Sequence, residues 1–136
     1  MAVASPAPCL ASQCVLSGSW RSDDGGRAVV SVLEPDGSFL GSYVPAAGGP
    51  QAVAWPLKGV QQDVALAAQP VFSFLVHRGP HGAPGGRTTA FVGQCYVDEA
   101  GEEALHALWL LRDAVQSPGQ DWKATRIGTS VFTRIK

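Results

Sequence analysis

The feature that most constrains this chain is the regular recurrence of turn-forming stretches. From Cys14 onward, segments such as SDDGG, EPDG, PAAGGP, DEAG and QSPGQ interrupt the sequence roughly every 8 to 14 residues. Glycine permits positive φ and proline fixes φ, as tight turns require, and the apolar runs between the turns are too short for a helical bundle. The pattern therefore predicts consecutive β-strands at residues 14–20, 27–33, 38–44, 54–60, 71–77, 88–97, 104–112 and 122–135.

Two of these segments carry conflicting signals. The run at 54–60 contains Pro56, which weakens it as a strand. In the run at 104–112, Leu105, Leu108, Trp109 and Arg112 also fit the spacing of one helical face. We interpret 104–112 as a strand because the segments on both sides of it are strands.

Eight strands joined mainly by short turns predict an all-β fold: an eight-stranded antiparallel up-and-down β-barrel, whose interior can hold one small ligand. Alternate residues of a strand share a face. In four of the predicted strands, an aromatic or small polar side chain then shares a face with small or apolar side chains. These groups are Tyr43 with Phe39 and Gly41, Phe91 with Gly93 and Cys95, Trp109 with Leu105 and Leu111, and Ser130 with Gly128 and Phe132. Such faces fit either a ligand cavity or a plain core.

Length and charge narrow the functional classes. A chain of 136 residues suits one domain, which we place at 14–136, and residues 1–13 read as an N-terminal tail resembling the remnant of a signal peptide. Charged residues make up only 15% and the net charge is −1, which argues against binding to nucleic acid or to an anionic membrane. No apolar run approaches membrane-spanning length.

Three cysteines are present. Cys14 and Cys95 could close a loop of about 80 residues, which would constrain the unfolded chain by roughly 4 to 5 kcal/mol and suggest an oxidising compartment. Cys9 in the tail is left over, either as a free thiol or for an intermolecular bridge. The absence of Asn excludes N-linked glycosylation.

Several motifs in order along the chain resemble the avidin family, and within it the egg-type biotin-binding proteins. They are CVLSGSW, GSYV, QPVFSF, FVGQC, WLLR and WKATRIGT, and the resemblance covers essentially 14–136. It implies a secreted homotetramer of eight-stranded barrels, each with biotin at one end of the barrel and with a disulfide between Cys14 and Cys95. It also implies that Trp122 reaches into the pocket of a neighbouring subunit.

Carried over by position, the resemblance assigns binding roles. Trp109, Phe91 and Leu111 match residues that enclose the rings and tail of biotin, and Tyr43 matches the hydroxyl donor that points at the ureido oxygen. Aromatic faces suit this task because they bury a large area with few rotatable bonds.

The polar contacts depart from the family pattern. Ser22 replaces an Asn donor, Gly26 replaces a Ser, Ser130 replaces an Asn or Asp acceptor, Pro45 replaces a Thr, and Gly48, Gly49 and Pro50 replace partners of the biotin carboxylate. A family Trp after the FSFLV strand also has no counterpart, since Arg78 and the long loop 78–87 follow there. Several lost hydrogen bonds and one lost Trp wall sum to roughly 5 to 7 kcal/mol, so we expect reduced affinity for biotin.

Other functions are weaker hypotheses. The site could bind another small hydrophobic ligand, or the chain could have a structural or interaction role. Between His77 and His81, Gly and Pro forbid the helix that a metal site of this spacing needs. No catalytic motif is present, so we expect neither an enzyme nor a cofactor besides the ligand. We do not assign Trp55 to the pocket.

Overall fold

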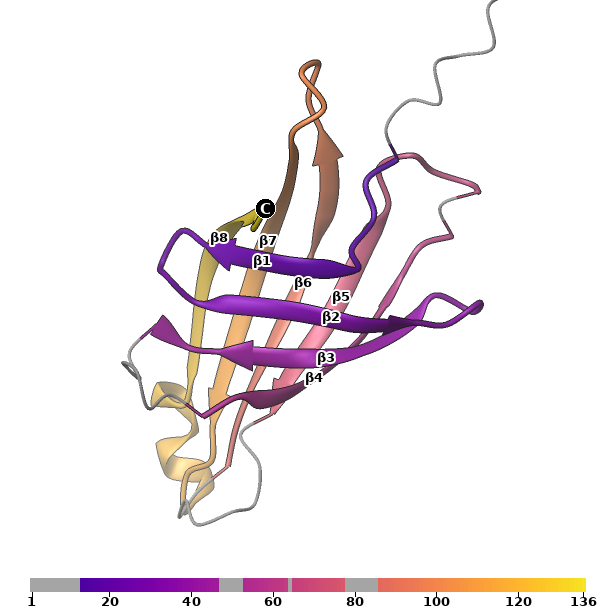
Figure 1. The fold of residues 1–136 in the computed structure, drawn as a ribbon. Helices are drawn as coiled ribbons and strands as arrows, with labels where there is room; N and C mark the ends of the chain where they lie inside the picture. The colour runs from indigo at the N-terminus through magenta and orange to yellow at the C-terminus, as the bar shows by residue number, and fades with distance from the viewer. Residues whose placement is uncertain (1–12, 47–52, 64, 78–85) are drawn as a thin grey trace, which may run out of the picture.

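The structure is a computed structural model, and it describes residues 13–46, 53–63, 65–77 and 86–136. Cys9, His81, Gly48, Gly49, Pro50 and Arg78 therefore lie outside the described residues. Within the described part, the chain forms eight strands and a 3-10 helix (Figure 1). These are β1 Gly18–Ser22, β2 Arg27–Leu33, β3 Ser38–Val44, β4 Trp55–Gln61, β5 Val71–His77, β6 Arg87–Val97, β7 Glu103–Asp113, the helix η2 Pro118–Lys123, and β8 Thr125–Arg134.

Each strand pairs antiparallel with the next one along the chain, and β8 pairs with β1, so that the sheet closes into a barrel. The expected eight-stranded antiparallel barrel is confirmed. The ambiguous segment 104–112 is a strand, because β7 pairs along its length with both β6 and β8. Pro56 is tolerated near the start of β4, where it lies opposite Ser42 of β3.

Two predicted strands were wrong at their beginnings. The segment 14–20 was expected to be a strand, but β1 begins only at Gly18. The segment 122–135 was expected to be extended throughout, but Trp122 belongs to η2 and the strand begins only at Thr125. Pro118 lies in the first turn of η2, where its fixed φ suits a helix. An ion pair between Arg112 of β7 and Asp121 then fastens this helix to the barrel wall.

The interior of the barrel is filled by alternating side chains of the strands. Its largest fully buried members are Trp20, Phe39, Phe74, Phe132, Leu57 and Leu105. Phe74 contacts several other rings, including Phe91, whose ring centroid is 4.6 Å away in a stacked arrangement. The aromatic packing closes one part of the barrel and leaves space in the other.

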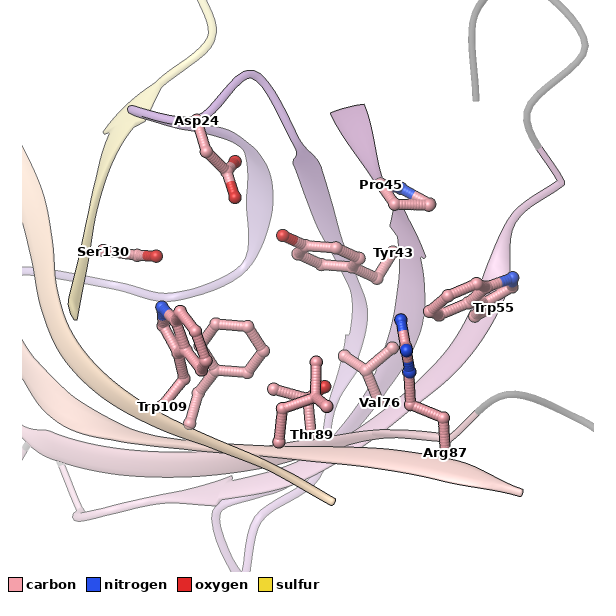
Figure 2. A pocket seen from close by; sticks show the side chains of 11 residues that line it. Asp24, Tyr43, Pro45, Trp55, Val76, Arg87, Thr89, Trp109 and Ser130 are labelled. Atoms are coloured by element: carbon pink, nitrogen blue, oxygen red, sulfur yellow. The ribbon is translucent and has the colours of Figure 1, made fainter. Parts of the chain in front are cut away.

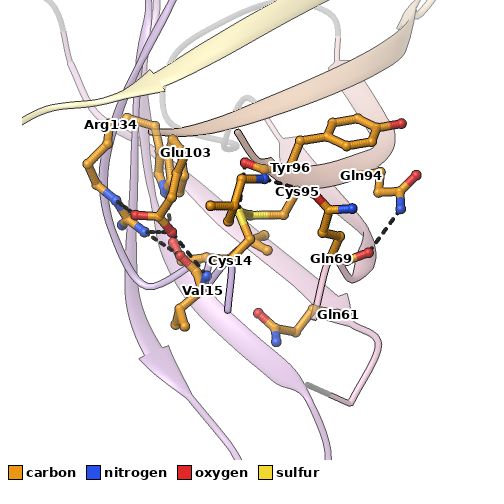
Figure 3. Close-up of a disulfide and its surroundings, with 12 residues drawn as sticks. Cys14, Val15, Gln61, Gln69, Gln94, Cys95, Tyr96, Glu103 and Arg134 are labelled. Atoms are coloured by element: carbon orange, nitrogen blue, oxygen red, sulfur yellow. Dashed lines mark hydrogen bonds and ion pairs between the residues drawn. A yellow bond between two sulfur atoms is a disulfide. The ribbon is translucent and has the colours of Figure 1, made fainter. Parts of the chain in front are cut away.

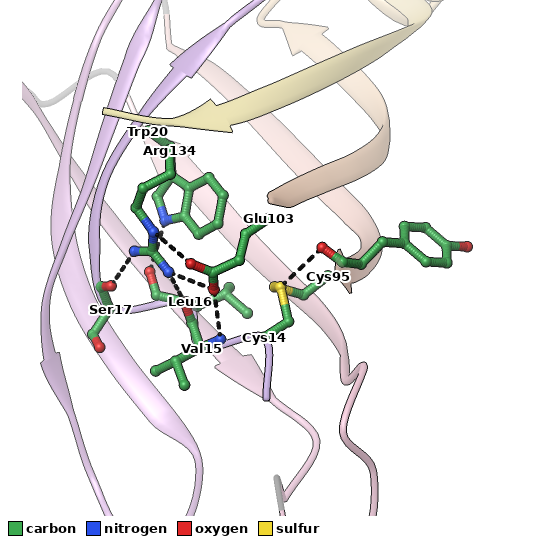
Figure 4. A network of polar contacts seen from close by, with 9 residues as sticks. Cys14, Val15, Leu16, Ser17, Trp20, Cys95, Glu103 and Arg134 are labelled. Carbon is green, nitrogen blue, oxygen red and sulfur yellow. Dashed lines mark hydrogen bonds and ion pairs between the residues drawn. A yellow bond between two sulfur atoms is a disulfide. The ribbon is translucent and has the colours of Figure 1, made fainter. Parts of the chain in front are cut away.

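A polar network secures the place where the first and last strands meet (Figure 4). The Arg134 guanidinium lies 4.0 Å from the centre of the buried Trp20 ring and donates to both carboxylate oxygens of Glu103, from Nε at 3.1 Å and from Nη2 at 2.8 Å. Arg134 also donates to the carbonyl oxygens of Val15 and Ser17. One arginine thus joins β8, β7 and the segment that enters β1.

The expected disulfide between Cys14 and Cys95 is present beside this network (Figure 3). Both cysteines are fully buried, and the bridge ties the segment before β1 to β6 across 81 positions of sequence. Cys14, Cys95 and Glu103 also form a group with metal-ligand geometry, but the two sulfurs are bonded to each other and Glu103 is paired with Arg134.

Within the described residues, no helix has the length and apolarity needed to cross a membrane.

The network around Arg134 yields a test of how the barrel is closed. We expect Arg134→Ala to lower the free energy of unfolding by about 2 to 3 kcal/mol, because it leaves the partly buried Glu103 without its partner and uncovers Trp20. Chemical denaturation would measure the loss. Lys136→Ala is the matched control, since its pair with Glu102 is largely exposed and should contribute little. Equal stability of the two variants would contradict this view of the network.

Candidate functional site

A cavity of about 230 Å³ opens inside the barrel wall at one end (Figure 2). Its apolar lining consists of Pro45, Trp55, Val76, Phe91, Trp109 and Leu111, and its polar lining consists of Asp24, Tyr43, Arg87, Thr89 and Ser130. The lining comes from the six strands β3 to β8, from the turn between β1 and β2 and from the residue after β3, so the cavity is a product of barrel closure. A concave, mainly apolar space with a few convergent polar groups is the usual form of a small-molecule site.

Three oxygen-bearing side chains meet in one part of the cavity, which we call the hydroxyl end: Asp24, Tyr43 and Ser130. Figure 2 shows the Asp24 carboxylate between the hydroxyls of the other two. Tyr43 and Ser130 are buried on β3 and β8, whereas Asp24 belongs to the turn between β1 and β2. The Asp24 Oδ1 atom accepts a hydrogen bond from the Gly26 N–H at 2.8 Å, which fixes the carboxylate relative to the turn.

Burial, reinforced by the negative charges of Asp24 and Asp23, raises the pKa of Tyr43 to about 12. The phenol therefore keeps its proton at neutral pH and can donate a hydrogen bond into the cavity. Gly26 makes room for this hydroxyl, because a Cβ atom at residue 26 would lie 2.6 Å from the Tyr43 oxygen.

Aromatic rings form the middle of the cavity wall. Phe91 packs against Tyr43 with ring centroids 5.8 Å apart. The Trp109 indole lies directly over Gly128 of β8, where a Cβ atom would come within 2.1 Å of the ring. The pairing of a large residue with a glycine on the neighbouring strand is what allows this indole to lie flat against the wall.

Arg87 and Trp55 mark the other part of the cavity, which we call the Arg87 end. The Arg87 Nε and Nη2 atoms donate to Asp113 at 2.6 Å and 3.1 Å, a bidentate pair that orients the guanidinium. The hydrogen bond to Asp113 raises the pKa of Arg87 above its usual value, so the group stays charged. Trp55 begins β4 directly opposite Tyr43 of β3.

The structure brings together six of the residues singled out from the sequence: Tyr43, Pro45, Phe91, Trp109, Leu111 and Ser130. The others lie elsewhere. Ser22 and Gly26 are buried beside the hydroxyl end without lining it, and the Ser22 hydroxyl bonds to the Asp23 carboxylate and to the Asp24 N–H. Trp122 is 83% exposed on η2 and does not line the cavity of its own chain.

Five lining residues were missed: Asp24, Trp55, Val76, Arg87 and Thr89. The exclusion of Trp55 from the pocket was wrong, because strand alternation places it on the same face as the buried Leu57. The same alternation, extended from Phe91, would have found Thr89 and Arg87. No pattern in the sequence pointed to Asp24, because the segment SDDGG indicates a turn and nothing more.

Comparisons with known proteins agree with this geometry. A sequence model of the avidin family matches residues 10–135. Avidin of Gallus gallus is 38% identical over 128 residues, which cover 93% of this chain and 82% of that protein. The solved structure of a biotin binding protein from chicken is 45% identical, with a TM-score of 0.78 over 91% of this chain and 98% of the other. The structure of Xenavidin is 33% identical, with a TM-score of 0.77 over 90% and 99% of the two chains.

The raised pKa of Tyr43 predicts a loss of stability in alkaline solution. Below pH 10 the phenol is protonated in both the folded and the unfolded chain, so its contribution to the free energy of unfolding is fully present. As the pH rises from 10 toward 12 this contribution is lost, because the phenol of the unfolded chain ionises first. Denaturation across this range should show the parent protein losing stability relative to Tyr43→Phe. Parallel stability curves for the two proteins would contradict the prediction.

Proposed function

The chain belongs to the avidin family, whose members are non-catalytic, and on this premise we propose that it binds biotin in the cavity of the barrel. The observation that carries the proposal is the order of groups along the cavity: hydroxyls at one end, aromatic rings in the middle and a guanidinium at the other end. Biotin presents its groups in the same order, as a cyclic urea, an apolar ring and tail, and a carboxylate.

Each part of the cavity then has a defined role. The protonated Tyr43 hydroxyl donates to the ureido oxygen, in the way that preplaced donors stabilise a polarised oxygen. The Ser130 hydroxyl accepts from a ureido N–H. Phe91, Trp109 and Leu111 enclose the rings and tail, and Pro45 borders the cavity near Tyr43.

Trp55 and Arg87 replace some of the ligand contacts of the family pattern that are absent from this sequence. Trp55 supplies an aromatic wall although no Trp follows the FSFLV strand, and it does so from a strand, where the side chain is held before the ligand arrives. Arg87 binds the ligand carboxylate: a guanidinium carries five N–H donors and Asp113 engages only its Nε and one Nη2 hydrogen.

We propose an affinity below that of the strongest biotin binders of the family. Ser22, Gly26 and Ser130 offer no amide at the hydroxyl end, and the first two do not line the cavity. Each missing neutral hydrogen bond costs about 1 kcal/mol, or roughly a fivefold change in the dissociation constant.

Titration with biotin, followed by heat or by Trp fluorescence, tests the function. We expect saturable binding to the parent protein and a Tyr43→Phe variant that binds roughly fivefold or more weakly, because one hydrogen bond to the ureido oxygen is lost. Tyr96→Phe is the matched control, since that ring lies on the outer face against His106. The absence of any response to millimolar biotin would contradict the proposal.

We also propose that the protein is a secreted homotetramer. The outer face of β5 to β8 exposes a continuous apolar surface: Val92 is opposite Leu108, and Leu110 is opposite Ile127. These four side chains are 44% to 66% exposed, which is unusual for neighbouring apolar residues of a monomer. The buried disulfide is compatible with an oxidising, extracellular compartment.

Two alternatives remain open to experiment. The carboxylate of Asp24 and the loss of amide donors favour a hydroxyl end that prefers another small ligand, which would then raise the melting temperature where biotin does not. A purely structural or interaction role would gain support if no small molecule stabilised the oligomer.

Substitution of Trp122 tests whether biotin binding depends on formation of the tetramer. In the single chain this indole is exposed on η2, and we propose that in the tetramer it covers the cavity of a neighbouring subunit. Trp122→Lys should then weaken biotin binding by about tenfold or more and shift the oligomer toward smaller species in light scattering. Trp122→Phe keeps an aromatic face and should retain most of both properties. Unchanged affinity and mass in Trp122→Lys would refute the role.

A further inference from the structure

We propose that Asp24 is a specificity-determining residue of the hydroxyl end, whose carboxylate raises the affinity for a protonated cyclic guanidine relative to that for a neutral cyclic urea. The inference rests on the proposed function, because it concerns which head group the same cavity accepts. It adds a specificity-determining residue to that cavity.

The position of the Asp24 carboxylate carries the argument. Both Asp24 Oδ1 and the Tyr43 hydroxyl lie over Gly26, at 3.2 Å and 2.6 Å from the point where a Cβ atom would be. Figure 2 shows the carboxylate directed into the cavity between Tyr43 and Ser130. The Gly26 N–H occupies one acceptor position of Oδ1, and a carboxylate has about four such positions, so others remain for a ligand.

The charged side chains near Asp24 do not neutralise the negative charge of its carboxylate. Asp23 is its neighbour in the turn, and it engages the Ser22 hydroxyl through its own carboxylate. Among the described residues that line the cavity, the one cationic side chain is Arg87, which lies at the opposite end and is paired with Asp113. The hydroxyl end therefore carries negative charge with no cation beside it among these lining residues.

This charge distinguishes two kinds of head group. The hydroxyls of Tyr43 and Ser130 can donate or accept, whereas an ionised carboxylate can only accept. A urea places an oxygen acceptor among these groups, and that oxygen is repelled by the carboxylate. A protonated guanidine of the same shape replaces the oxygen with an N–H and adds a positive charge, so all three side chains can accept from it.

Solvent access determines how strongly the Asp24 carboxylate interacts with a ligand head group. Asp24 is exposed in the open cavity, where water screens its charge. A bound head group would displace that water, and the interaction between the carboxylate and the ligand would then strengthen. The selectivity is therefore a property of the complex and needs bound ligands to be measured.

The test compares biotin with 2-iminobiotin, in which an imine nitrogen replaces the ureido oxygen and which is protonated at neutral pH. Dissociation constants for both compounds are measured by calorimetry at neutral pH for the parent protein, Asp24→Asn and Asp23→Asn. We expect Asp24→Asn to weaken 2-iminobiotin relative to biotin by at least about tenfold, because a charge-assisted hydrogen bond is lost. Asp23→Asn removes the same charge from the same turn and should change the ratio by less than about threefold.

The ratio of two constants on one protein does not depend on how much of a variant is folded. If biotin binds but the ratio is the same in the parent and in Asp24→Asn, or falls equally in both variants, the inference is overturned and the proposed function stands. If biotin does not bind, and 2-iminobiotin binds the parent protein and is weakened at least about tenfold by Asp24→Asn but less than about threefold by Asp23→Asn, the inference stands and the proposed function fails. If neither compound binds the parent protein, both are overturned.

Discussion

The rest of the structure depends on the short pairing of β1 with β8, which closes the barrel. Only three residue pairs join these strands, Trp20 with Arg134, Arg21 with Thr133 and Ser22 with Phe132, whereas β6 pairs with β7 along its whole length. A seam with so few ladder hydrogen bonds needs other support. It comes from Arg134, which lies in the seam, covers Trp20 and bonds to Glu103, and from the disulfide that holds the entering segment against β6.

The same closure assembles the hydroxyl end of the cavity. The turn after β1 is attached to the last strand by a hydrogen bond of 2.9 Å from the Asp23 N–H to the Val131 carbonyl oxygen. Val131 follows Ser130, so this bond places Asp24 beside the Ser130 hydroxyl. Loosening of the seam would separate Ser130 on β8 from Asp24 and Tyr43, which lie on the other side of the seam in the β1–β2 turn and on β3. Stability of the seam and geometry of the site are therefore one structural problem.

Local patterns predicted the fold well and the site only in part. Turn chemistry and two-residue alternation located the eight strands. Alternation alone did not distinguish a cavity from a core, and the resemblance to the avidin family singled out Phe91, Trp109 and Ser130, which line the cavity. Trp122 was misplaced in a strand, because a single helical turn led by Pro118 has no periodic signal. Asp24 could not have been found, since a carboxylate in a turn usually stabilises only the turn, and its contact with the cavity depends on strands far away in sequence.

If the cavity binds its ligand as we propose, its two ends have different physical roles in ligand choice. At the Arg87 end, Trp55 and Arg87 stand at the first positions of β4 and β6, and Arg87 is further held by Asp113. Such groups are in place before a ligand arrives, so binding there requires little ordering and favours any molecule with an apolar body and an anionic tail. At the hydroxyl end, two of the three side chains adapt to the ligand by rotating a hydroxyl hydrogen, and the third cannot. In the binding mode that we propose, affinity shared by many ligands therefore arises mainly at the Arg87 end and along the aromatic wall. Discrimination between head groups then falls to Asp24, the side chain of the hydroxyl end whose hydrogen-bonding role is fixed by its charge.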